Sequence, residues 1–175
     1  MPEGCLAYMV VTNKNRKRKK NVLILGIGNL VLNDEGVGIH IIHILKSIGM
    51  PDGVDVLDGG MGSIELLDTM KQYKHLILID ATTDDCPAGT VRRLTPHYPK
   101  DYPHTLYAHE KIVGDMIDAI QKEERKPHIE LLAISVNHTP NLGIQLSPEI
   151  RRVIPQVLQL IFEILDDKSH SRYYR

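Results

Sequence analysis

Three nearly continuous runs of valine, isoleucine and leucine constrain the fold of this chain more than any other feature. They occupy residues 21–27, 75–81 and 128–136. Strands that read as unbroken aliphatic runs, without alternating polar residues, are typical of sheets covered on both faces. The sequence therefore predicts an α/β fold in which helices flank a mostly parallel sheet.

Amphipathic stretches alternate with these runs, as expected for helices that connect parallel strands. The remaining predicted elements are helices 35–48, 63–72, 109–122 and 148–165 and strands 54–58 and 89–95. Loop 82–88 is too short to contain a crossover helix, so strand 89–95 is expected to run antiparallel to the strand before it. The prediction is thus a five-stranded mixed sheet with one antiparallel strand.

Composition indicates one globular domain, because 42% of the 175 residues are hydrophobic and 25% are charged. We expect this domain over residues 21–166, after a basic N-terminal tail (1–20) and before a C-terminal tail (167–175). Beyond Lys20 the chain has 15 basic and 21 acidic residues, so its body would repel phosphate. No apolar run approaches the roughly 18–20 residues of a membrane span. We therefore expect neither a nucleic acid nor a membrane as partner.

Cysteine usage and motif searches exclude several classes of hydrolase. Cys5 and Cys86 form neither a disulfide framework nor a metal clip, which fits a reducing cytoplasm, and a lone loop thiol such as Cys86 is usually incidental. His109 and Glu110 begin like a zincin motif, but Val113 occupies the position of the second histidine. No Gly-x-Ser-x-Gly elbow is present. A hydrolase of this sequence would not be a serine, cysteine or HExxH enzyme.

Residues 25–38, LGIGNLVLNDEGVG, join the first predicted strand to the first helix and place Asp34 and Glu35 at the helix start. A structural cap is one interpretation, because acid at a helix N-terminus gains about 0.3–1 kcal/mol from the dipole. A dinucleotide loop is disfavoured, since carboxylates would repel phosphate and Val31 replaces the third glycine of the fingerprint. The loop is better interpreted as presenting acid to a cationic group.

Ligands of open α/β sheets gather outside the carboxyl ends of the strands. The acidic and imidazole candidates at these positions are Glu35 with Asp34, Asp58, Asp80, His109 and His138. Asp80 ends an aliphatic strand, where a carboxylate is costly unless it is solvated, paired or bound to a cation; a turn acid is the alternative. Two carboxylates and one imidazole suit nickel, zinc, manganese or iron and leave coordination positions open.

His104 competes with His109 as the imidazole ligand. The other histidines are interpreted as surface or packing residues: His40, His43, His75, His97, His128 and His170. The sequence alone does not choose among the possible metals.

Several motifs, taken in order, resemble the hydrogenase maturation endopeptidase family. They are GIGNLVLNDEGVG at residues 26–38, DGGMG at 58–62, LILIDA at 76–81 and His109 in an aliphatic helix. The resemblance covers roughly residues 21–165 and implies a three-layer α/β/α fold with a five-stranded mixed sheet. It also implies an endopeptidase that removes a C-terminal extension from the nickel-loaded precursor of a nickel–iron hydrogenase large subunit.

The resemblance further implies that Glu35, Asp80 and His109 recognise nickel, which the precursor supplies, although other divalent metals could occupy the site. The metal could polarise the scissile carbonyl or activate water, with Asp34 or Asp58 as general base, so an aspartyl-type and a metal-dependent mechanism stay open. The expected partner is the precursor, and the protease itself is expected to be monomeric. The alternative is a non-catalytic chaperone on the same fold that binds metal or precursor.

Overall fold

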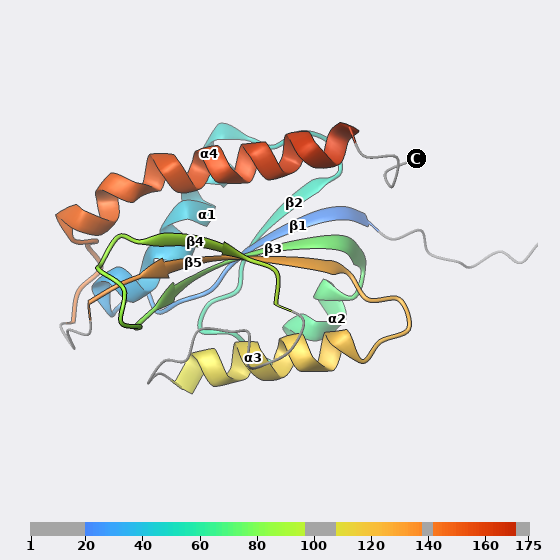
Figure 1. The fold of residues 1–175 in the computed structure, drawn as a ribbon, viewed down its shortest axis with the longest axis horizontal. Coiled ribbons are helices and arrows are strands. Elements are labelled where there is room, and N and C mark those ends of the chain that lie inside the picture. Colours follow the sequence, from blue (N-terminus) through green and yellow to red (C-terminus); the bar gives the residue numbers. More distant parts are fainter. Residues whose placement is uncertain (1–19, 97–107, 138–141, 171–175) are drawn as a thin grey trace, which may run out of the picture.

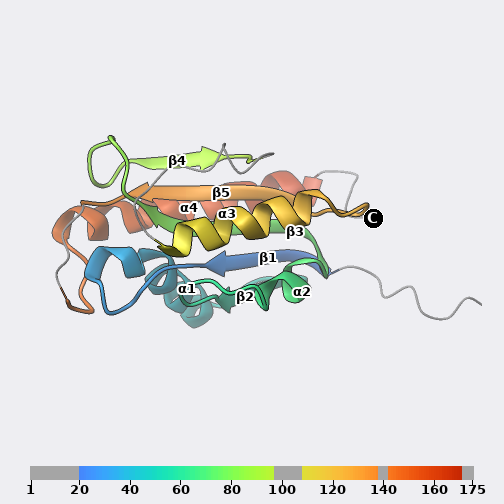
Figure 2. The ribbon, with the colours of Figure 1, turned by 90° about the horizontal axis from the view of Figure 1, so that it is seen from below.

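A five-stranded mixed sheet forms the centre of the molecule. The structure is a computed structural model that describes residues 20–96, 108–137 and 142–170. The strands are β1 (Lys20–Gly26), β2 (Val54–Asp58), β3 (Tyr73–Thr82), β4 (Val91–Leu94) and β5 (His128–Ser135). Their order across the sheet is β2-β1-β3-β5-β4, in which β4 is antiparallel to β5 and the other neighbouring pairs are parallel (Figure 2).

Helices cover both faces of this sheet and make three layers (Figure 1). One face carries α1 (Val37–Ile48) and α4 (Pro148–His170), and the other carries α2 (Leu66–Met70) and α3 (Ala108–Gln121). Successive strand residues point to opposite faces, so Ile24 and Ile77 pack under α1 and α4, whereas Leu23 and Leu76 pack on the α2 and α3 side. The predicted α/β/α architecture is confirmed, and double coverage explains why the central strands are mostly aliphatic.

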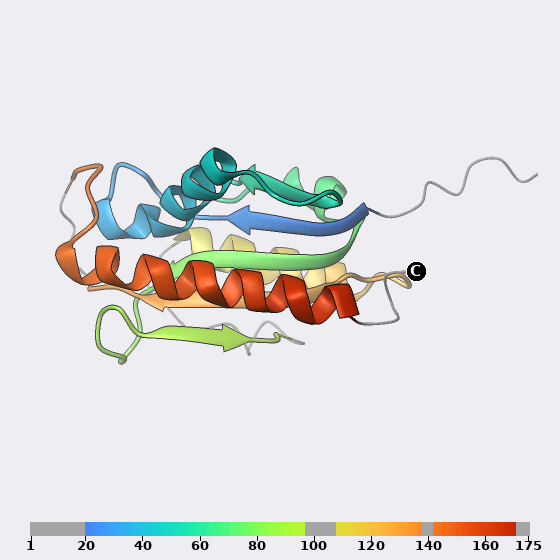
Figure 3. The same cartoon turned by 90° about the horizontal axis from the view of Figure 1, so that it is seen from above.

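Strand β4 runs antiparallel to β3, as predicted, but its hydrogen-bonded neighbour is β5 and not β3. It pairs with β5, in a register that joins Val91 to Ile134 and Leu94 to Leu131. Strand β3 is already flanked by β1 and β5, because the crossover through α3 places β5 at its free side (Figure 3). The chain between β3 and β4 must therefore step past β5 to the edge of the sheet.

The first predicted helix begins later than expected. Residues Asn33–Gly36 form a 3-10 turn, η1, and the α-helix starts at Val37, so Asp34 and Glu35 precede the helix instead of forming its first turn. The reason is local: the Glu35 carbonyl accepts the N–H of Asn29 at 3.1 Å and is thereby engaged outside the helix.

Other boundaries also differ from the prediction. The predicted helix 63–72 is reduced to the five residues of α2, and α4 continues to His170, beyond the predicted helix end at residue 165. The end of α4 has neither glycine nor proline to stop it. The basic tail 1–20 lies outside the described residues except for Lys20, which begins β1. Within the described ranges, no helix combines the length and the hydropathy that a membrane crossing requires.

Helix α1 approaches the two central strands so closely that Gly38 has no room for a side chain. A Cβ at this position would lie 2.4 Å from the carbonyl oxygen of Ile27 and 2.5 Å from that of Ile79. Both neighbours are backbone atoms, which cannot move aside by a rotamer change. The glycine therefore sets the distance between α1 and the sheet.

Replacing Gly38 by alanine should lower the free energy of unfolding by about 1–3 kcal/mol, the usual cost of overpacking a tight interior. The matched control is Gly114→Ala in α3, where a Cβ would meet no atom within 4 Å. That variant should gain up to about 1 kcal/mol from helix propensity. Urea unfolding of both variants measures the contrast, and equal stabilities would contradict the proposed close approach.

Candidate functional site

Glu35 is fixed at the carboxyl end of β1 by backbone contacts of its own turn. Its side chain is buried, with 6% exposure, and its N–H donates to the Leu32 carbonyl at 3.2 Å. Gly28 has a φ of +150°, and a Cβ there would lie 2.0 Å from the Glu35 carbonyl oxygen. A glycine is thus needed at position 28, because the backbone there lies directly against the turn that carries Glu35.

Asp80 lies two residues before the end of β3 and is fully buried. Side-chain alternation places it on the α3 face, with Leu76 and Leu78. Turn η1 contacts β3, and the Ile27 N–H donates to the Ile79 carbonyl at 2.9 Å. The structure therefore brings the turn that carries Glu35 into contact with the strand that carries Asp80.

His109 lies in the first turn of α3, but its side chain is outside the described part of the chain, and His104 is outside it altogether. The amino end of α3 is on the same side of the molecule as the carboxyl ends of β1 and β5 (Figure 2). The backbone position of His109 is thus compatible with the predicted ligand set. The choice between His109 and His104 stays a prediction.

Asp34 connects two loops that are far apart in the sequence. Its Oδ1 accepts the N–H of Ser147, just before α4, at 2.6 Å. The same loops are paired through their backbones, because the Asn33 N–H donates to the Gly143 carbonyl at 2.8 Å and the Gly143 N–H donates to the Val31 carbonyl at 3.0 Å. Asp34 therefore has a structural contact that its sequence position did not predict.

A polar pocket of about 150 Å³ opens beside Glu35, between these two loops. Its lining is Leu32, Asn33, Asp34, Glu35, Asn137, Gln145 and Ser147. Sequence reasoning missed the two amides, Asn137 and Gln145. Asn137 follows β5, so its place at the carboxyl edge of the sheet was an available clue, whereas Gln145 reaches the pocket only through the loop pairing.

Asp58 is held apart from Asp80 by an intervening strand. Because β1 lies between β2 and β3, the two positions are separated by about 10 Å, twice the usual strand spacing. The Asp58 carboxylate accepts the Gly60 N–H at 2.9 Å and lies 3.4 Å from the Nε2 atom of His43 on α1. Its assignment as a general base stays a prediction.

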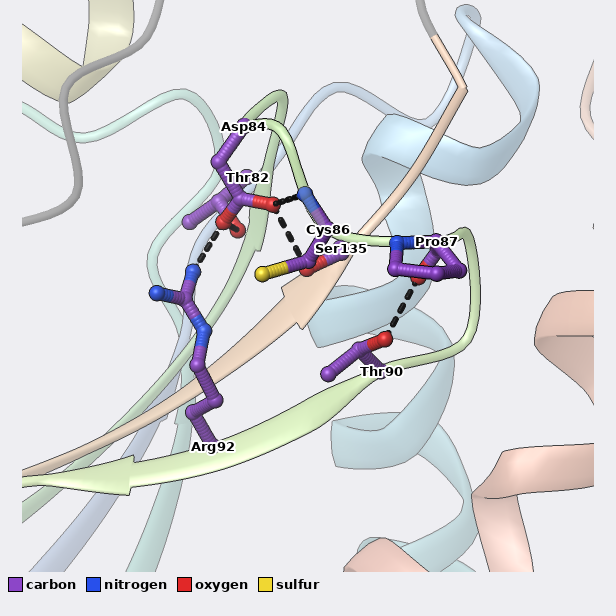
Figure 4. A network of polar contacts seen from close by, with 7 residues as sticks. All are labelled: Thr82, Asp84, Cys86, Pro87, Thr90, Arg92 and Ser135. Carbon is purple, nitrogen blue, oxygen red and sulfur yellow. Dashed lines mark hydrogen bonds and ion pairs between the residues drawn. The ribbon is translucent and has the colours of Figure 1, made fainter.

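Asp84 organises the loop that follows Asp80 (Figure 4). Its carboxylate accepts the Cys86 N–H at 3.0 Å and the hydroxyls of Ser135 and Thr82 at 2.9 and 3.0 Å. The Arg92 guanidinium on β4 completes the group. The network ties the ends of β3 and β5 to β4, and Cys86 contributes its backbone to this network.

Burial of Asp84 would by itself raise the pKa of its carboxyl group. The hydrogen bonds from Cys86, Ser135 and Thr82, together with the positive charge of Arg92, outweigh that effect and hold the pKa below its usual range. Asp84 is therefore ionised around neutral pH. A charged, hydrogen-bonded carboxylate makes the chain that follows Asp80 rigid.

Comparison with known proteins gives a consistent result. A family model described as "Hydrogenase maturation protease" matches residues 39–164, a range that includes Asp80 and His109 and begins just after Glu35. Hydrogenase 2 maturation protease of Escherichia coli is 29% identical over 151 residues, covering 85% of this chain and 92% of that protein. Putative hydrogenase maturation protease MJ0253 of Methanocaldococcus jannaschii is 26% identical over 151 residues, covering 82% of this chain and 96% of that protein.

Solved structures agree with the sequence relatives. Hydrogenase maturating endopeptidase HybD from E. coli superposes with a TM-score of 0.76 at 27% identity, over 85% of this chain and 93% of that chain. The fold of hydrogenase maturation protease HybD from Thermococcus kodakarensis is also similar, with a TM-score of 0.66 at 22% identity, over 82% of this chain and 98% of that chain. The similarity therefore spans most of the length of each protein.

Removing the carboxylate of Asp34 should loosen the contact between the two loops. Asp34→Ala leaves the Ser147 N–H without its acceptor, at a cost of about 1–3 kcal/mol in the free energy of unfolding. Asp34→Asn keeps an acceptor oxygen and should cost clearly less. Urea unfolding distinguishes the two variants, and equal losses would show that the hydrogen bond to Ser147 contributes little.

The Asp84 network should make stability depend on pH at the acid side. Because the pKa of Asp84 is lowered in the folded state, its contribution is complete above the unfolded-state pKa of about 3.9 and is lost as the pH falls through the folded-state value. Asp84→Asn should therefore be less stable than wild type by about 1–3 kcal/mol near pH 7, with a difference that shrinks below about pH 4.

Urea unfolding at a series of pH values measures this difference. The control is Asp85→Asn, which changes the exposed neighbouring carboxylate and should follow the wild-type pH profile. A constant difference between wild type and Asp84→Asn across the acid range would contradict the assignment.

Proposed function

This chain belongs to the hydrogenase maturation protease family, and from that premise we propose that it is an endopeptidase removing a C-terminal extension from a nickel–iron hydrogenase large-subunit precursor. Family membership identifies it as a peptidase of hydrogenase maturation. The C-terminal cleavage position and the precursor as partner are the proposed parts. The observation that supports the proposal is the burial of two carboxylates, Glu35 and Asp80, which belong to a turn and a strand in contact with each other.

The nickel of the precursor is the proposed recognition signal. Glu35 and Asp80 supply oxygen donors, and His109 at the start of α3 supplies the imidazole nitrogen, a combination that suits a divalent ion of this type. Burial favours such a role, because a carboxylate removed from water needs a cation or hydrogen-bond donors. Three protein ligands leave the coordination incomplete, so groups of the precursor would complete it.

Cleavage would then depend on the metal, since a precursor without nickel lacks the group that these residues bind. Of the two candidate bases, Asp34 is better placed than Asp58, because it lines the same pocket as Glu35. Asn137 and Gln145 add amide groups to that pocket, and these can both donate to and accept from a peptide backbone. The pocket thus offers polar partners for an extended segment of the precursor beside the proposed metal position.

Incubation of the protein with its precursor, in nickel-loaded and nickel-free forms, tests the function. We expect the mass of the loaded large subunit to fall by a C-terminal peptide and that of the nickel-free form to stay unchanged. Glu35→Gln and Asp80→Asn should each slow cleavage by about 100-fold or more, because losing even a residue that only orients a ligand typically costs 10–100-fold. The control is Glu163→Gln, at an exposed position on α4.

The outcomes separate the alternatives. Equal cleavage of both precursor forms would reject nickel as the recognition signal while leaving the peptidase activity intact. An unchanged mass in a stable complex would instead indicate the non-catalytic chaperone. Folding of each variant is checked by its urea transition, so loss of cleavage is not mistaken for loss of structure.

A further inference from the structure

A second group of potential metal ligands lies toward the other end of the same strands. His75 is near the start of β3, and His128 and Glu130 are at the start of β5. His75 and His128 are direct neighbours in the strand register, and their rings stack with centroids 4.8 Å apart. Asp80 is five positions after His75, which corresponds to about 17 Å along an extended strand. The group is therefore distinct from the corner that holds Glu35 and Asp80.

All three side chains point to the same face of the sheet. Residues two positions further along β3 and β5, Ile77 and Leu132, lie on this same face and pack in the core under α1 and α4. His75 and Glu130 are buried, with 3% and 2% exposure, whereas His128 retains 47%. The half-exposed ring of His128 leaves a route for an ion to reach the buried pair.

The distances from the Glu130 carboxylate to the two imidazoles match those between ligands of a tetrahedral metal site. The Oε1 atom of Glu130 lies 3.3 Å from His75 Nε2 and 3.6 Å from His128 Nε2. Ligands bound to zinc at about 2.0–2.2 Å with tetrahedral angles are about 3.3–3.6 Å apart. One donor atom from each residue can be chosen so that all three lie within 4.8 Å of one another. A small rotation of the exposed His128 ring can bring the two nitrogens closer.

Arg93 on β4 orients the carboxylate. Its Nε atom donates to Glu130 Oε2, which leaves Oε1 as the oxygen nearest both imidazoles. A partner that fixes a ligand's orientation in this way is typical of metal sites.

We propose that His75, His128 and Glu130 form a second divalent metal site, separate from the proposed nickel-recognition corner. Two imidazoles and one carboxylate are a ligand set used for zinc, with water in the fourth position. Because the ligands come from β3 and β5, and Arg93 adds β4, a bound ion would fasten three adjacent strands at their buried face. The site stabilises the fold and takes no part in the proposed cleavage.

Zinc titration of chelator-treated protein tests this site. The Glu35→Gln/Asp80→Asn double variant is used as the background, so that the other proposed metal position does not contribute. Calorimetry should detect binding of one Zn²⁺ ion with a rise in the thermal unfolding midpoint, and Co²⁺ should give the visible absorption of a tetrahedral complex.

His128→Gln in that background should weaken zinc binding at least about tenfold and abolish the zinc-dependent rise in the midpoint. Its half-exposed position favours a folded variant, which the urea transition verifies. The matched control is His43→Gln, which changes a similarly exposed histidine on α1 and should leave zinc binding unchanged.

Two results would overturn the proposal. Equal zinc affinity of the background protein and of its His128→Gln variant would show that the ion binds elsewhere. Absence of zinc binding in the background protein would identify the group as a hydrogen-bonded cluster without metal affinity. Neither result bears on the cleavage experiment, because that experiment depends on Glu35 and Asp80.

Discussion

The close contact between α1 and the two central strands determines where the candidate site can form. Gly38 lies against the carbonyl groups of Ile27 and Ile79, and Gly28 lies against the carbonyl of Glu35. Any side chain at these glycines would push the helix or its preceding turn away from the sheet. The turn that carries Glu35 would then lose its contact with β3, the strand that carries Asp80. Backbone proximity, more than any side-chain contact, therefore positions the acidic pair.

The sequence was sufficient to predict the architecture. Nearly continuous aliphatic runs required cover on both faces, and the carboxyl ends of parallel strands necessarily lie at one edge, where the sequence predicts Glu35 and Asp80. Register and pairing between distant segments are not encoded in local patterns. The hydrogen bond between Asp34 and Ser147 joins residues 113 positions apart, and no spacing rule could have indicated it.

The same limit applies to His75 and His128, whose proximity is not encoded in local sequence patterns. His75 and His128, interpreted from the sequence as surface or packing residues, are 53 positions apart in the chain (128 minus 75). Only the register of β3 against β5 places them side by side and adds Glu130 to the pair. The predicted helix boundaries differ from the observed ones for another reason. The start of α1 depends on the hydrogen bond that the Glu35 carbonyl accepts from Asn29, and α4 continues because no glycine or proline stops it.

The pairing of the two loops around the pocket has a mechanical consequence. Residues 31–34 and residues 143–147 are joined by two backbone hydrogen bonds and by the Asp34 carboxylate, and a Cβ at Gly143 would collide with the side chain of Asn33. The two loops are therefore tied to each other between β1 and α4. A peptide that displaces one of these loops would also displace the other, so its entry into the pocket would shift the first turn of α4.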